Sequence, residues 1–241
     1  MTNTQRAFGT LYMVPVTLGD DNLSYVIPAD VMHLVQGLEY FVVENEKSAR
    51  RFLSSVKTNK PVRELNFQLL NEHTADKDLP ALITPLLAGH NIGMLSEAGC
   101  PGIADPGAVL AALAHKKGIR VSPLVGPSSI LLGLMASGFN GQQFTFLGYL
   151  PSDKSARIAK LKEIEKQSLR LNETQIFIET PYRNQHMLED ILANCSANSK
   201  LCIARNVSLE TELVVSKTVA EWKKSELPDL HKQPTVFLLL A

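Results

Sequence analysis

The chain has 241 residues, of which 45% are hydrophobic and 20% charged, and its 24 basic and 24 acidic residues give a formal net charge of +0. This length suits one large domain or two modest ones, and the composition is that of an ordinary soluble globular protein. The balanced charge argues against a protein that coats nucleic acid non-specifically, although a local basic patch stays possible.

The three cysteines, Cys100, Cys195 and Cys202, are odd in number and lack the spacing of metal ligands. We therefore expect neither a disulfide framework nor a metal site, and reduced cysteines are typical of a cytoplasmic protein. The first ten residues lack the apolar core of a signal peptide. The apolar stretches fall short of the about 18 residues that a membrane span needs, so no membrane association is expected.

Apolar runs bounded by glycine and proline alternate with segments of helical spacing. In chain order we expect strands at 11–16 and 40–43, helices at 47–56 and 78–87, a strand at 92–95, a helix at 104–117, a strand at 121–125, a helix at 128–136, a strand at 144–150, a helix at 153–167, a strand at 175–178, a helix at 186–194, a strand at 201–204, a helix at 219–224 and a strand at 236–240. This alternation predicts an α/β protein with largely parallel strand pairing. The pattern restarts near 125–127, which divides the chain into domains 1–125 and 126–241.

Two of these strands end in loops rich in glycine and proline, Ser96–Gly107 and Gly126-Pro127. Parallel strands end at one edge of their sheet, where ligands bind, and glycine lets the backbone approach a ligand closely. The first loop matches neither the Walker A motif nor the Rossmann fingerprint. It is either a structural turn or a ligand site of another kind.

Four side chains near these loops are candidates for acid or base chemistry. Glu97 and Asp105 flank the glycines of the first loop, and Asp105 has the alternative role of capping the helix that starts near Pro106. Glu44 follows a predicted strand, where it meets either a ligand or solvent. His73 lies either near a substrate or on the surface.

Several basic residues are candidate phosphate contacts, with solvated surface as the alternative. They are Arg50, Arg51, Arg63, Lys154, Arg157, Arg183 and Arg205. Arg183 and Arg205 differ from the others because each follows an apolar strand at the expected ligand edge. The net positive helix at 153–167 is interpreted as solvated surface or as a contact to nucleic acid.

Five segments together resemble the tetrapyrrole-methylase-like (class III) methyltransferases. They are GTLYMVP (9–15), SEAGCPGIADPG (96–107), GIRVSPLVGPSS (118–129), FLGYLP (146–151) and IFIETPYR (176–183). Within that superfamily the chain most resembles the ribosomal RNA small-subunit methyltransferase I branch, which methylates a cytidine ribose 2′-hydroxyl in 16S rRNA. The order and spacing match along nearly the whole chain.

The resemblance implies two α/β/α domains with mostly parallel sheets, S-adenosylmethionine in the cleft between them, and a homodimer. It also implies ribosomal RNA or the small ribosomal subunit as substrate. Of the basic residues named above, Arg50, Arg51 and Arg183 are predicted to contact this RNA. The residues implied to bind the cofactor are Pro15, Ser96, Ala98, Gly99, Cys100, Ile103, Ser128, Ser129, Tyr149, Leu150, Phe177, Ile178, Ala204, Arg205, Asn206 and Thr235.

Two loops on the substrate side depart from the branch. The segment 16–23 reads VTLGDDNL where the branch usually carries Ile-Gly-Asn-Leu-Gly-Asp, and Glu44–Lys47 reads ENEK where it usually carries Glu-Asp-Thr-Arg. Two alternatives therefore stay open, a methylase of a small molecule such as a tetrapyrrole and a non-catalytic protein that binds the cofactor. A ribose hydroxyl needs a base to become nucleophilic, and Glu97, Asp105, Glu44 and His73 are the candidates.

Overall fold

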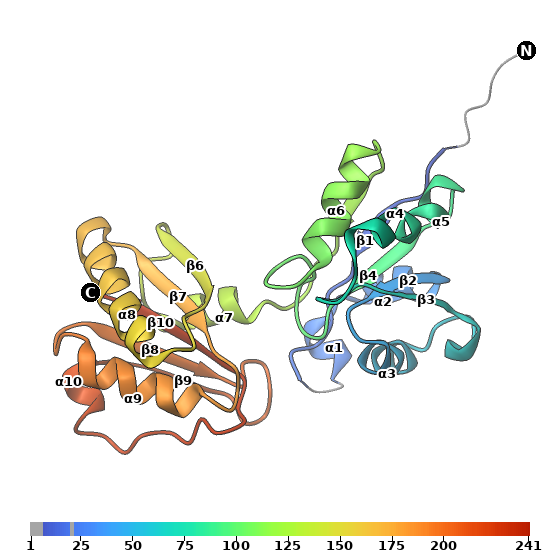
Figure 1. The fold of residues 1–241 in the computed structure, drawn as a ribbon. Coiled ribbons are helices and arrows are strands. Elements are labelled where there is room, and N and C mark those ends of the chain that lie inside the picture. The colour runs from blue at the N-terminus through green and yellow to red at the C-terminus, as the bar shows by residue number, and fades with distance from the viewer. Residues whose placement is uncertain (1–6, 20–21) are drawn as a thin grey trace, which may run out of the picture. The chain divides into compact units, whose positions relative to one another are not determined.

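The computed structural model describes residues 7–19 and 22–241. Contacts divide the chain into unit 1, residues 1–128, and unit 2, residues 129–241 (Figure 1). This division falls three residues after the boundary that the sequence suggested. Asp20 and Asp21 of the altered loop 16–23, and most of the N-terminal segment considered above, lie outside the described residues.

In its described part, unit 1 contains a five-stranded, fully parallel sheet with the strand order β3-β2-β4-β1-β5. The strands are β1 (Leu11–Met13), β2 (Tyr40–Val43), β3 (Asn66–Leu69), β4 (Ile92–Leu95) and β5 (Val121–Pro123). The central strand β4 is buried along its whole length, as expected of a parallel sheet covered on both faces. All five carboxyl ends therefore lie at one edge.

Helices cover both faces of this sheet (Figure 1). Val43 and Leu95 point to the face that packs against α1 (Leu23–Val26), α2 (Ala29–Gln36) and α3 (Glu46–Val56). Val42 and Met94, one residue earlier on each strand, point to the other face and pack against α4 (Leu79–Leu82), α5 (Thr84–Leu87) and α6 (Gly107–Lys116). Short 3₁₀ turns, η1 (Val62–Glu64) and η2 (Asp76–Asp78), complete the connections.

The described part of unit 2 holds a second five-stranded sheet, with the order β6-β7-β10-β8-β9. Its strands are β6 (Phe144–Tyr149), β7 (Thr174–Ile178), β8 (Lys200–Arg205), β9 (Leu213–Thr218) and β10 (Thr235–Leu240). β6 and β7 are parallel, but β10 runs antiparallel to both β7 and β8, and β9 is antiparallel to β8. The α/β class is confirmed, and mostly parallel pairing is right for unit 1 and wrong for unit 2. There β9 folds back through a short loop, as antiparallel strands can.

Unit 2 is also layered. Stacked rings of Phe177 and Phe237, with centroids 5.7 Å apart, lie on the face covered by α8 (Lys154–Leu171), α9 (Asn184–Asn194) and α10 (Val219–Trp222). The opposite face carries Ile176 and Leu238 and packs against α7 (Ser129–Ser137). The helix–sheet–helix arrangement implied by the resemblance is therefore present in each unit.

Within residues 7–19 and 22–241, no helix is long and apolar enough to cross a membrane, and no group of three or more His, Cys, Asp or Glu residues is arranged to hold a metal ion. The three cysteines are free thiols. Burial raises the pKa of Cys195 to about 12, so this thiol stays protonated and unreactive at neutral pH.

Candidate active site

The loop Ser96–Gly107 is held against the ends of two other strands of unit 1. The backbone N–H of Val16, beyond β1, donates to the carbonyl oxygen of Gly99 at 2.9 Å. The Cys100 thiol donates to the carbonyl oxygen of Pro127, beyond β5, at 3.3 Å. Three segments predicted to contact the cofactor, around Pro15, Gly99 and Ser128, are thus gathered at the carboxyl edge of this sheet.

Glycine is required in this arrangement for two different reasons. Gly99 has φ +71°, in the left-handed region that other residues adopt at a cost of about 1–2 kcal/mol. At Gly126 a Cβ atom would lie 2.3 Å from the side chain of Pro15, so a side chain there would force the ends of β1 and β5 apart.

The carboxylate of Asp105 organises the loop itself. It accepts hydrogen bonds from the backbone N–H of Gly102 at 2.9 Å and of Gly107 at 2.7 Å. Gly107 is the first residue of α6 and Pro106 is its N-cap, one position later than the sequence suggested. Asp105 is therefore not the N-cap residue, but both of its oxygens are engaged by loop N–H groups, which favours a structural role over a role as base.

An open cleft of about 630 Å³ lies at the ends of β2, β3 and β4. Its described lining contains all four acid–base candidates and no lysine or arginine. The lining residues are Glu44, Asn45, Asn71, Glu72, His73, Glu97, Ala104, Asp105 and Pro106. The segment 71–73 reaches the cleft because it follows β3, a strand that the sequence did not predict.

Glu44 has the most perturbed environment of these candidates. Partial burial raises its pKa, the hydrogen bond from the Glu97 N–H to its Oε2 at 3.1 Å opposes that rise, and the charges of Asp105 and Glu97 add to it. Glu97 itself is exposed. The His73 side chain is 83% exposed and lies 3.6 Å from Glu72. A partly desolvated carboxyl group that lines a cleft suits proton transfer better than a fully solvated one.

The two arginines of α3 that were predicted to contact RNA differ in their surroundings. Arg50 forms an ion pair with Glu46 at 2.6 Å, donates to the carbonyl oxygen of Val62 at 3.1 Å and lies 4.3 Å over the ring of Phe67. Its guanidinium group therefore joins α3 to η1 and β3. Arg51 is exposed and lines a small pocket of about 30 Å³ beside Glu97.

In unit 2, the ends of β7 and β8 meet the start of β10 at one edge of the sheet, where Arg205 pairs with Thr235. Asn206 donates to Gln233 Oε1 at 2.6 Å and to Thr211 Oγ1 at 2.9 Å. Arg205 donates to the carbonyl oxygen of Asp229 at 2.9 Å. This edge therefore gathers the predicted cofactor residues 178, 205, 206 and 235.

Three of the residues predicted to bind the cofactor have side chains in the core of unit 2. Leu150, Phe177 and Ala204 are 4%, 0% and 1% exposed, so only their backbone atoms can contact a ligand. By contrast, Ile103 is 49% and Tyr149 is 57% exposed, and their side chains are available.

Buried polar atoms without a partner concentrate at the same edge of unit 2. Among the described residues, six buried side-chain polar atoms have no hydrogen-bond partner, and five of them belong to this edge. The five are Glu179 Oε2, Arg183 Nε, Asn184 Oδ1, Arg205 Nε and Asn206 Oδ1. An unpaired buried polar group costs about 1–3 kcal/mol, so this concentration indicates a site for a polar ligand. The sequence did not single out Glu179 or Asn184.

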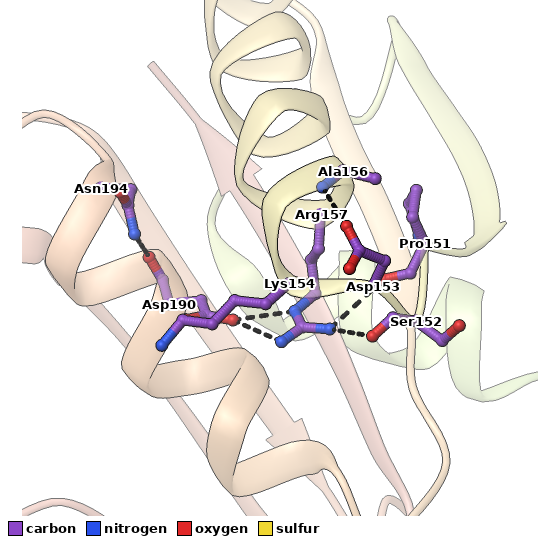
Figure 2. Close-up of polar contacts among 8 residues, drawn as sticks. All are labelled: Pro151, Ser152, Asp153, Lys154, Ala156, Arg157, Asp190 and Asn194. Carbon is purple, nitrogen blue, oxygen red and sulfur yellow. Dashed lines mark hydrogen bonds and ion pairs between the residues drawn. The ribbon is translucent and has the colours of Figure 1, made fainter.

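Arg157 is not a phosphate contact. Its side chain is 8% exposed, and its Nη2 and Nε donate to Asp190 Oδ2 at 2.6 and 2.8 Å (Figure 2). Its Nη1 donates to the carbonyl oxygen of Ser152 at 2.8 Å. Burial and this ion pair make Arg157 a link between α8, α9 and the loop after β6, whereas the sequence analysis interpreted this helix as solvated surface or as a contact to nucleic acid.

Solved structures with a similar fold are methyltransferases or related enzymes. Diphthine synthase matches with a TM-score of 0.69 and 14% identity, covering 97% of this chain and 90% of that chain. The methyltransferase CobJ matches with a TM-score of 0.62 and 15% identity, covering 97% and 94%. At such identities the likeness defines the fold, which is the one that tetrapyrrole methylases share.

Sequence similarity to curated proteins defines the family more narrowly than the similarity in fold does. Ribosomal RNA small subunit methyltransferase I of Vibrio cholerae is 30% identical over 211 residues, covering 88% of this chain and 69% of the relative. The enzyme of the same name from Xylella fastidiosa is 28% identical over 233 residues, covering 97% and 81%. No protein-family profile matches the chain. The chain belongs to the ribosomal RNA small subunit methyltransferase I family, and it is a methyltransferase.

Proposed function

We propose that the protein transfers a methyl group from S-adenosylmethionine to the ribosomal RNA of the small subunit, at the ribose 2′-hydroxyl of a cytidine in 16S rRNA. The observation that carries this proposal is the identity of about 30% with small-subunit rRNA methyltransferases over most of the chain. The cleft of unit 1 supplies carboxylates for the chemistry. The homodimer implied by the resemblance stays a prediction.

The residues present suit S-adenosylmethionine. In unit 1 the Ser96–Gly107 loop has left-handed glycines at 99 and 102, where the backbone carries no side chain of its own and a ligand can approach it closely. In unit 2 the unpartnered oxygens of Asn184 and Asn206 are acceptors for a ligand that carries amine hydrogens. When bound, the cofactor supplies an electrophilic methyl group.

For the chain's own chemistry, we assign the role of general base to Glu44. With Oε2 bonded to the Glu97 N–H, Oε1 would accept the proton of the ribose hydroxyl. Glu44 would keep the proton that the hydroxyl loses when the bound cofactor gives up its methyl group. The protein must also hold the reacting atoms in line.

The variant Gly99→Val tests the assignment of the loop. Valine is β-branched and strained at φ +71°, and its Cβ would lie 3.3 Å from the Leu18 side chain, so we expect the loop to shift and the affinity for S-adenosylmethionine to fall at least tenfold. Isothermal titration calorimetry measures this. Gly141→Val is the matched control, because a Cβ there meets nothing within 4 Å. Wild-type affinity in Gly99→Val would show that the loop does not hold the cofactor.

Labelled S-adenosylmethionine and small ribosomal subunits from a strain deleted for this gene test the function itself. We expect label in 16S rRNA at a ribose 2′ position, identified by nuclease digestion and mass spectrometry. Label in a tetrapyrrole mixture and none in rRNA would replace the proposal by a small-molecule methylase. Cofactor binding with no transfer to either would favour a non-catalytic binding protein.

A further inference from the structure

We propose that two loops of unit 2, residues 179–183 and 229–232, form a surface that binds single-stranded RNA, with the ring of Tyr182 as a stacking platform for a base. We call it the Tyr182 surface. It deepens the proposed function, on which it rests, by naming a surface of unit 2 that holds the RNA substrate.

The need for such a surface follows from the charge of the cleft in unit 1. Its described lining carries four carboxylates, from Glu44, Glu72, Glu97 and Asp105, and no lysine or arginine. A lining of this kind repels the phosphate groups of RNA, whose contacts supply much of the affinity in nucleic-acid binding. The cleft can admit a nucleoside, but cations elsewhere must hold the backbone.

Tyr182 has the geometry of a stacking residue. Tyr182 is 66% exposed, so much of its aromatic ring faces solvent. The His231 ring meets it edge-on, with centroids 6.2 Å apart and planes at 78°, and the Lys232 ammonium lies 5.7 Å from its centroid. An exposed aromatic ring bordered by cations is how proteins bind unpaired bases.

The surface is held in place before any ligand arrives. The Lys232 N–H donates to the carbonyl oxygen of Pro181 at 2.9 Å, which joins the two loops next to Tyr182. Arg183 donates through Nη2 to Glu179 Oε1 at 2.7 Å, and the Glu179 side chain is 1% exposed. Because these contacts already order the loops, RNA binding loses less conformational entropy at the surface.

The charges around Tyr182 favour an anionic partner. Lys232 is exposed, the Arg183 side chain is 43% exposed, and Arg205, at the end of β8, donates to the carbonyl oxygen of Asp229 in the second loop. The carboxylates nearby are Glu179, which is buried under Arg183, and Asp229, whose Oδ1 accepts the His231 N–H at 2.9 Å. The Lys232 ammonium therefore lies over the ring, Arg183 follows Tyr182 with its charge paired to Glu179, and Asp229 is the exposed carboxylate of the second loop.

The test measures binding of the full chain to a fluorescein-labelled, unstructured 12-nucleotide RNA by anisotropy. Tyr182→Ala is expected to weaken binding about tenfold or more, as loss of base stacking does, whereas Tyr182→Phe keeps the ring and stays within about twofold of wild type. Tyr25→Ala is the matched control, because Tyr25 is 73% exposed in unit 1. Lys232→Gln is expected to reduce the slope of log affinity against log salt by about one unit.

The outcomes separate this inference from the proposed function. Methylation of small subunits by the wild type, with equal RNA affinity for Tyr182→Ala and wild type, would overturn the Tyr182 surface and leave the function standing. Equal losses in Tyr182→Ala and Tyr25→Ala would also overturn it, since no specific platform would then exist. If the wild type methylates no RNA, the function fails, and the anisotropy series still decides whether the surface binds RNA. S-adenosylmethionine affinity in Tyr182→Ala, expected to be unchanged, confirms that the variant is folded.

Discussion

Replacing Asp190 by alanine is expected to lower the free energy of unfolding of unit 2 by about 3–5 kcal/mol, because it leaves the buried guanidinium of Arg157 without its counter-charge. The Asp190 side chain is 7% and that of Arg157 8% exposed, and two short hydrogen bonds join them (Figure 2). Urea denaturation followed by the fluorescence of Trp222 measures the change. Trp222 is the one tryptophan in the sequence and is 2% exposed in unit 2.

Two further variants test this explanation. Lys154 also faces Asp190, at 3.8 Å, but its side chain is 73% exposed, so Lys154→Met is expected to cost no more than about 1 kcal/mol. The double variant Arg157→Met with Asp190→Leu removes both charges and is expected to recover most of the loss. If Asp190→Ala lowers the free energy of unfolding by less than about 1 kcal/mol, the buried ion pair between Arg157 and Asp190 is contradicted. A buried charge without its partner destabilises a protein by more than that.

Glu44→Gln is expected to lower kcat for RNA methylation about 10²- to 10⁴-fold, the usual contribution of a general base. The amide keeps the shape of the side chain and an oxygen for the Glu97 N–H, so the affinity for S-adenosylmethionine stays near that of wild type. Single-turnover rates with labelled cofactor and small subunits measure the effect.

The pH dependence of this reaction has a definite sign. Only the deprotonated Glu44 accepts a proton, and burial raises its pKa above the ordinary value for glutamate. The rate therefore falls as the pH drops through that raised pKa, at a higher pH than an unperturbed glutamate would give, and Glu44→Gln abolishes this limb of the profile. Glu97→Gln is the comparison. A large loss there, with little loss in Glu44→Gln, would transfer the role of base to Glu97.

Much of the fold could be predicted from the sequence, because strongly apolar runs have few alternatives to burial. The run Tyr40–Val43 is a strand with the predicted bounds, as is Ile92–Leu95. The helix predicted at 78–87 is instead two short helices separated at Ile83, since Pro85 has no N–H to continue the hydrogen-bond ladder. The edge strand β3 has no fully buried residue, so its hydrophobic pattern was too weak to predict a strand.

Local sequence predicted the loops of the candidate site, but it could not predict the parts that depend on pairing between distant segments. The glycine-rich loop was found by composition, and two of its glycines, Gly99 and Gly102, have left-handed backbones, while its role as a cofactor site stays a prediction. The antiparallel insertion of β10 brings Gln233 beside Asn184 and Asn206, a contact no local pattern encodes. Likewise, nothing near Arg157 in the sequence reveals that its charge is neutralised by Asp190, a residue of another helix, α9.

The position of β10 has a consequence for how the protein is made. This strand lies between β7 and β8, yet it is synthesised after both, so the sheet of unit 2 stays split until Thr235–Leu240 have left the ribosome. Unit 1 closes its own sheet with β5, more than a hundred residues earlier. On a translating ribosome unit 1 can therefore fold while the sheet of unit 2 still lacks its central strand. During that interval the edges of β7 and β8 are unpaired, and we expect chaperones that bind nascent chains to act mainly on unit 2.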